Sequence, residues 1–156
     1  GALCDWVEIE NTGSETADLS GMHLTDKAGE ARYTFPEGTL LAPGAFTVVW
    51  CSGDGTEGAD YAAIRLAKAG ESVILTDADG NALDRIQTPF LADDTSYARV
   101  SGEWCVTNRP TPGFANTEEG YARLRGRCGA DHRGLPPQRS RSAGRRRRFA
   151  GLDRAL

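Results

Sequence analysis

The sequence has few of the residues that build metal and redox sites. Its 156 residues include 2 histidines, 4 cysteines and 1 methionine, and no two cysteines form a C-x-x-C pair. These counts argue against a zinc ribbon and against a disulfide-dense scaffold. Cys128-x-x-x-His132 is half of a zinc motif without a second pair of ligands. We therefore expect neither a metal nor a cofactor.

Long apolar runs are absent as well. No run approaches the ~20 residues that cross a bilayer, so we expect no membrane span. The sequence opens with Gly1 and has no basic segment followed by an apolar one, so we expect any export signal to lie outside it. Hydrophobic residues make up 39% and charged residues 26%, which is typical of a globular chain of one domain.

Charge divides the chain into two parts. Residues 1–116 carry 7 basic and 18 acidic side chains, whereas residues 117–156 carry 11 arginines, 4 acids and no lysine. This change, with the loss of any aliphatic pattern, predicts a folded domain over residues 1–124 and an Arg-rich disordered tail over residues 125–156. An alternative is that residues 125–156 were translated in a shifted reading frame, which would give the same composition. The run Arg145–Arg148 favours an alternative function, nucleic-acid binding through contacts to phosphates, although nucleic acid is not the expected partner.

Alternation at residues 5–11 predicts a half-buried strand. Val7 and Ile9 share one face, and Glu8 and Glu10 share the other. Trp6 lies on the polar face, where it is either covered by a neighbouring element or exposed as a platform for a ligand. Trp6 is the one candidate ligand-contacting residue that this pattern provides.

Turn signals separate several further short strands. Asp79-Gly80 is a strong hairpin signal, and Pro43-Gly44 fits the centre of a type II turn. Eight or nine short strands with turns every 8–12 residues are typical of an antiparallel sandwich, so we expect an all-β fold. The residues expected to pack between its sheets are Val7, Ile9, Leu24, Phe35, Phe46, Val48, Trp50, Leu66, Val73, Leu75 and Ile86.

One motif suggests an enzyme. Gly53-x-Gly55-x-x-Gly58 follows an apolar run and precedes an Ala-rich stretch and Asp77, the order found in a dinucleotide-binding βαβ unit. Such a site requires a helix over residues 59–69, whereas residues 61–66 alternate as a strand does. Acids in the loop would also repel a pyrophosphate. We interpret the motif as a Gly-rich loop and keep the dinucleotide-binding enzyme as a remote alternative.

No catalytic constellation stands out elsewhere. Nothing resembles a G-x-S-x-G elbow, so we expect no catalytic residue and no enzyme. Several aspartates would supply oxygen ligands to calcium if their loops met, but they lack the spacing of an EF-hand. We interpret them as solvated turn residues: Asp77, Asp79, Asp84, Asp93 and Asp94.

Six stretches taken in order resemble the lamin tail domain family, an immunoglobulin-like β-sandwich. They cover residues 5 to about 120 and read DWVEIENTG, ADLSGMHLTD, YTFPEGTLLAPGAFTVVWCSG, IRLAKAGESVILTDADGNALD, DDTSYARV and PTPGFANTEEG. The variant is similar to bacterial copies attached to spore-coat-protein-H-type kinases and to extracellular nucleases. Members of the family usually begin one strand earlier, so we expect this chain to lack its first strand and to leave backbone groups of residues 4–10 unpaired.

The resemblance implies a function without catalysis. It implies an accessory module of a bacterial secreted or cell-surface protein, which binds a protein or glycan ligand and is tethered to a separate catalytic domain. It implies an extracellular or cell-surface location. The family offers no motif of catalytic residues to transfer to this sequence.

Overall fold

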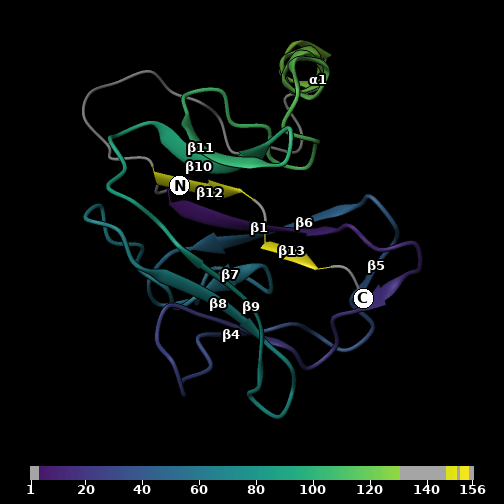
Figure 1. The fold of residues 1–156 in the computed structure, drawn as a ribbon. Helices are drawn as coiled ribbons and strands as arrows, with labels where there is room; N and C mark the ends of the chain where they lie inside the picture. Colours follow the sequence, from purple (N-terminus) through teal and green to yellow (C-terminus); the bar gives the residue numbers. More distant parts are fainter. Residues whose placement is uncertain (1–3, 131–146, 151, 155–156) are drawn as a thin grey trace.

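The computed structural model describes residues 4–130, 147–150 and 152–154, and nearly all regular structure in them is β (Figure 1). Its one helix in that part of the chain is α1 (Glu118–Ala130). The strands are β1 (Asp5–Asn11), β2 (Ala17–Asp18), β3 (His23–Thr25), β4 (Tyr33–Thr34), β5 (Leu40–Leu41), β6 (Phe46–Cys51), β7 (Tyr61–Ala62), β8 (Ser72–Thr76), β9 (Ala82–Gln87), β10 (Thr95–Val100), β11 (Glu103–Thr107), β12 (Arg147–Ala150) and β13 (Leu152–Arg154).

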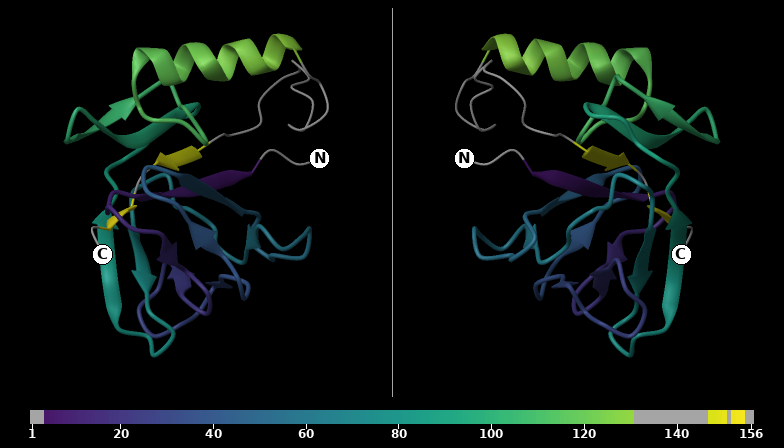
Figure 2. Two further views of the ribbon diagram at one scale, coloured as in Figure 1. Left: turned by 90° about the vertical axis from the view of Figure 1, so that its right-hand side faces the viewer. Right: turned by 90° about the vertical axis from the view of Figure 1, so that its left-hand side faces the viewer.

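Two sheets form the layers of a sandwich. The larger has the order β11-β10-β12-β1-β6-β7, with β13 also paired to β1, and the smaller has the order β4-β3-β8-β9. The hairpins β8–β9 and β10–β11 and the pair β1–β6 are antiparallel, while β12 runs parallel to both of its neighbours. Helix α1 lies at the end of the molecule opposite the smaller sheet (Figure 2). The expected all-β, immunoglobulin-like sandwich is confirmed.

The open position expected beside β1 is occupied. β1 pairs with β6 on one side and with β12 and β13 on the other, so its backbone is not left without a partner there. The strand that fills the position comes from the segment for which we expect disorder, and the composition of that segment gives no sign of it. The remaining tail residues, 131–146, 151 and 155–156, lie outside the described residues. Their disorder stays a prediction.

The core between the sheets is aliphatic and aromatic. Val7 and Ile9 of β1, Leu24 of β3, and Val73 and Leu75 of β8 are each 2% exposed or less, as expected. Burial of an aliphatic side chain of this size contributes roughly 1.5–3 kcal/mol, so these positions provide much of the free energy of folding.

The prediction of which face of β6 points into the core is wrong. Three residues of β6 that were expected inside are only partly buried: Phe46, Val48 and Trp50. The core instead contains Val49 and Cys51, which are 1% and 5% exposed. β6 is apolar at nearly every position, so its sequence contains no alternation from which the inward face could be read. Val48 and Trp50 pack instead on the outer face of the larger sheet, against Trp6. Ile86, also expected inside, is partly buried and packs against the edge of the core.

The turns follow their sequence signals. Gly80 has a φ of 87° in the turn that joins β8 to β9. Gly44 has a φ of 68°, and the amide of Ala45 donates to the carbonyl of Ala42 across the Pro43-Gly44 turn, as a type II turn requires. The sequence therefore predicts these two turns correctly.

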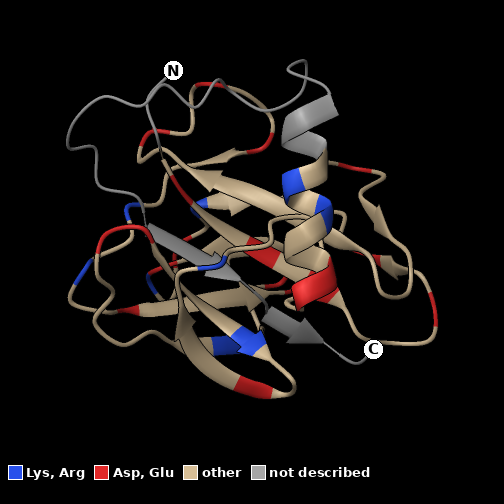
Figure 3. Cartoon of the chain, turned by 90° about the horizontal axis from the view of Figure 1, so that it is seen from above, with Lys and Arg blue, Asp and Glu red and all other residues tan. Residues whose placement is uncertain are grey.

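Helix α1 is a feature that we did not expect. Thr117 caps it, because the Thr117 hydroxyl accepts a hydrogen bond from the amide of Gly120 at 3.0 Å. Glu118 and Glu119 fill its first turn, where carboxylates oppose the positive end of the helix dipole, and basic residues follow (Figure 3). The expected domain boundary after residue 124 falls inside this helix.

Candidate functional site

A groove crosses the outer face of the smaller sheet. It has a volume of about 600 Å³ and lies between the loop at residues 26–31 and the turn at residues 77–81. Strands β3, β8 and β9 form its base. Its lining combines polar and apolar side chains with glycine backbone, and consists of His23, Thr25, Ala28, Gly29, Glu30, Ala31, Ile74, Thr76, Ala78, Asp79, Gly80, Ala82 and Arg85.

The base of the groove is set by strand register. His23 of β3 pairs with Thr76 of β8, and Thr25 pairs with Ile74, so these four residues share one face of the sheet. Ile74 and Thr25 are 3% and 2% exposed, which makes the base firm. Nδ1 of His23 is 2.9 Å from the hydroxyl of Thr34 on β4, a contact that orients the imidazole ring.

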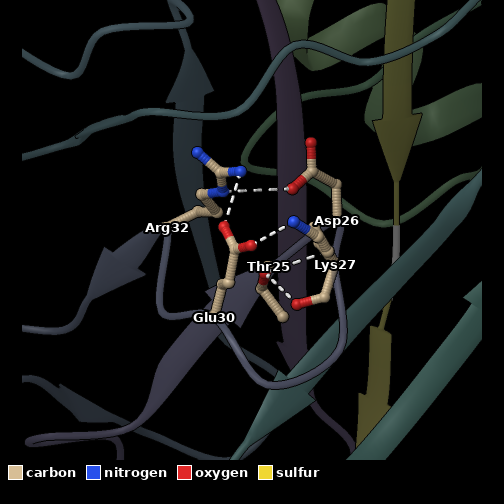
Figure 4. Close-up of polar contacts among 5 residues, drawn as sticks. All are labelled: Thr25, Asp26, Lys27, Glu30 and Arg32. Atoms are coloured by element: carbon tan, nitrogen blue, oxygen red, sulfur yellow. Dashed lines mark hydrogen bonds and ion pairs between the residues drawn. The ribbon is translucent and has the colours of Figure 1, made fainter.

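One wall of the groove is a loop held by charge. The Thr25 hydroxyl donates to the carbonyl of Lys27 and accepts from its amide, which turns the chain sharply (Figure 4). Glu30 forms ion pairs with both Lys27 and Arg32, and Nε of Arg32 faces Oδ1 of Asp26 at 3.7 Å, an ion pair longer than a hydrogen bond. Exposed ion pairs contribute little stability singly, but this network fixes the course of the loop.

The opposite wall is the turn after β8. The Asp77 carboxylate accepts hydrogen bonds from the amides of Asp79 and Asn81 and from the Asn81 side chain. These bonds stabilise the ionised form and lower the pKa of Asp77. Asp79 is exposed on this ordered turn, and Arg85 of β9 is exposed and also lines the groove. The groove thus has a carboxylate and a guanidinium on one side and the polar loop on the other.

On the outer face of the larger sheet, in contrast, the area around Trp6 is covered. Trp6 and Ala98 are 2% and 1% exposed and pack with Val48, Trp50 and Val100. This burial agrees with a Trp covered by a neighbouring element. A ligand contact at Trp6 stays a prediction, and it would require the covering residues to move.

Glu8 lies under the same cover, although its sequence pattern indicates a solvated face. It is 0% exposed, and its Oε1 accepts a hydrogen bond of 2.5 Å from the amide of Gly113, 105 residues along the chain. Burial raises the pKa of Glu8 to about 8, against the opposing effect of that hydrogen bond. Oε2 of Glu8 has no hydrogen-bond partner within the described residues. The carboxyl therefore ties the segment after β11 to the centre of the larger sheet.

The glycine motif does not form a nucleotide site. Gly53, Gly55 and Gly58 lie in the loop between β6 and β7, and residues 59–69 contain β7 and turns but no helix. Gly53 and Gly55 have φ values of 91° and 68°, so the glycines serve a tight loop. Without a helix N-terminus there is no cradle for a pyrophosphate, and the dinucleotide-binding interpretation is wrong.

Among residues 4–126, no three metal-ligating side chains of the kinds His, Cys, Asp and Glu come together. Cys4, Cys51 and Cys105 are free, and burial raises the pKa of the Cys51 thiol well above its usual value. The Cys128-x-x-x-His132 motif extends past the described residues at His132. No helix within the described residues is long and apolar enough to cross a membrane.

A comparison with protein families agrees with this architecture. The model of the lamin tail domain matches residues 1–89, which is more than half of the chain. The domain is immunoglobulin-like and is generally a non-catalytic interaction module. No curated protein and no solved structure matches the chain. The chain belongs to the lamin tail domain family.

Proposed function

We propose that this domain is a non-catalytic accessory module of a bacterial secreted or cell-surface multidomain protein. In this proposal it binds a protein or glycan ligand in the groove over β3, β8 and β9, while a separate domain of the same protein carries the catalysis. One observation carries the proposal. The outer face of the smaller sheet holds an open hollow of about 600 Å³, whereas the outer face of the larger sheet is covered around Trp6.

The chemistry of the groove suits a ligand with hydroxyl or amide groups. Arg85 donates hydrogen bonds and Asp79 accepts them, and both side chains are exposed at the rim. Gly29 and Gly80 bring bare backbone to the lining, so that a ligand can approach closely. The buried Ile74 supplies an apolar patch at the base. A few polar groups around an apolar base is the usual make-up of a binding pocket.

The test is a binding screen with matched variants. The labelled chain is applied to an array that carries bacterial cell-wall glycans and extracellular proteins. Arg85→Ala and Asp79→Asn are compared with Arg65→Ala and Glu37→Ala, exposed substitutions outside the groove lining. We expect the groove variants to lose roughly tenfold or more in affinity, since each removes a hydrogen bond to a charged group. Binding that all four variants retain equally would place the ligand elsewhere.

A further inference from the structure

Strand β11 is an open edge of the larger sheet. It has β10 on one side and, within the described residues, no strand on the other (Figure 1). Glu103, Cys105 and Val106 are exposed, so neither face of the strand is covered. Edge strands are usually protected from pairing by lysine, proline or a bulge, and β11 contains none of these. The edge is therefore available to another strand.

The turn before β11 determines which of its backbone groups face this edge. The turn at residues 101–102 has φ values of 52° and 87°, as in a tight hairpin with a two-residue loop. The pair beside such a turn is hydrogen-bonded, and bonded pairs alternate with non-bonded pairs along the hairpin. The register gives the residues of β11 whose backbone groups face β10 as Glu103, Cys105 and Thr107. The amides and carbonyls of Trp104 and Val106 therefore face the open edge.

A second copy of β11 matches this edge in one register. If two antiparallel copies meet across a two-fold axis at Cys105, Trp104 of each lies opposite Val106 of the other. Each of these two pairs then exchanges two main-chain hydrogen bonds. An axis at Trp104 would require bonds from residue 102 in the turn, and an axis at Val106 would require bonds from residue 108, beyond the end of β11. Only the axis at Cys105 keeps every bonded residue within the strands.

The side chains fit the same register. Trp104 stacks on a tyrosine of β10 with ring centroids 5.2 Å apart, and Val106 is 49% exposed beside it. Opposite pairs of an aromatic and a β-branched residue are favourable, so the pairing covers exposed apolar surface. On the other face, Glu103 lies opposite Thr107 of the second copy and diagonal to its Arg109. The register thus brings opposite charges near each other and opposes no like charges.

We propose that β11 is a self-association edge, to which a second copy of this chain adds its own β11 in antiparallel orientation across a two-fold axis at Cys105. A strand of five residues buries much less than the ~1,000 Å² of a stable interface, so the pairing is weak and transient. The two Cys105 residues form a non-bonded pair with Cα atoms about 4.5 Å apart. That separation is within the range of about 4.4–6.8 Å that a disulfide spans.

The experiment traps the pair in a buffer of oxidised and reduced glutathione. Each oxidised glutathione takes up two thiol hydrogens and leaves as two reduced molecules, while the two Cys105 sulfurs join. Covalent dimer is measured by intact mass and by electrophoresis without reductant. We expect the full chain to form the dimer and Cys105→Ser to form roughly tenfold less or none. The other cysteines are kept in both chains and give the common background: Cys4, Cys51 and Cys128.

The register is tested with displaced cysteines in the Cys105→Ser chain. Glu103→Cys and Thr107→Cys are oxidised separately and as a mixture. Residue 103 lies opposite residue 107 of the second copy, whereas each is roughly 14 Å from its own counterpart. We expect the mixture to cross-link roughly tenfold faster than either variant alone. Equal rates would indicate random collision of exposed thiols and would overturn the proposal.

Val106→Pro separates strand pairing from cysteine chemistry. The amide that proline removes faces the open edge, so the hydrogen bonds between β10 and β11 remain while both bonded pairs of the dimer lose a donor. We expect an unchanged circular dichroism spectrum and roughly tenfold slower trapping through Cys105. A folded Val106→Pro chain that is trapped as fast as the parent would refute pairing at this edge. If the substitution unfolds the sandwich, the comparison of residues 103 and 107 decides alone.

Discussion

Glu8→Gln should change how the stability of the domain depends on pH. Glu8 is completely buried, and burial raises its pKa to about 8 from the 4.5 of a free side chain. Between these values the unfolded chain has released the proton and the folded chain keeps it, so the folded state loses stability as pH rises. Each unit of pKa difference is worth about 1.4 kcal/mol of stability. The folded state should therefore lose roughly 3–6 kcal/mol as the pH rises from below 4.5 to above 8.

Glutamine keeps the shape of the side chain and removes the titration. Its oxygen can still accept the bond from Gly113, while its amide group takes the place of the unpartnered Oε2 at a cost of roughly 1–3 kcal/mol. We therefore expect Glu8→Gln to be less stable than the parent at pH 5 and more stable at pH 9, with a flatter profile between.

Urea unfolding followed by tryptophan fluorescence at pH 5, 7 and 9 measures this effect. Glu103→Gln is the control, because Glu103 is exposed and the substitution likewise removes one carboxyl from the unfolded chain. Comparing the pH profiles of the two variants separates the effect of Glu8 from the general electrostatic repulsion within an acidic chain. If the parent and Glu8→Gln respond to pH in parallel, Glu8 is ionised in the folded state, and the assignment of a neutral buried carboxyl is wrong.

Three further substitutions test the packing. Val49→Ala should lower the free energy of unfolding in urea by roughly 2–3 kcal/mol, and Val48→Ala should lower it clearly less, because only Val49 lies in the core. Equal losses would mean that the face of β6 is misassigned. Gly70→Ala should lower the melting temperature by several degrees, since Gly70 has a φ of 97° and a Cβ there would overlap the carbonyl oxygen of Thr88; an unchanged melting temperature would refute this close approach. Thr117→Ala should cost about 1 kcal/mol and reduce the helical signal in circular dichroism, whereas Thr117→Ser should retain both.

Much of the sandwich can be read from local pattern. The alternation of β1, the Asp79-Gly80 turn and the apolar β8 each specify their own structure, because side-chain period and turn chemistry act over a few residues. β6 shows where this reading stops. A strand that is apolar on both sides does not reveal which side meets the core, and the outer side of β6 meets Trp6 instead.

The burial of Glu8 and the groove could not be predicted, since both depend on contacts between distant segments. Glu8 accepts a hydrogen bond from the amide of Gly113, 105 residues away, and no local pattern indicates such a contact. The groove requires the loop at residues 26–31 to stand opposite the turn at residues 77–81. Helix α1, by comparison, could have been found from Thr117 followed by two glutamates, a local start signal.

Chemical-shift mapping is the measurement that tests the proposed groove most directly. The amide spectrum of the isotope-labelled chain is recorded with and without the strongest ligand from the array. The proposal predicts that shifts concentrate at Thr25, Gly29, Gly80 and Arg85 of the groove lining, and that Arg85→Ala makes them clearly smaller at the same subsaturating ligand concentration. Shifts confined to β10, β11 and α1, with the groove amides unmoved, would contradict it.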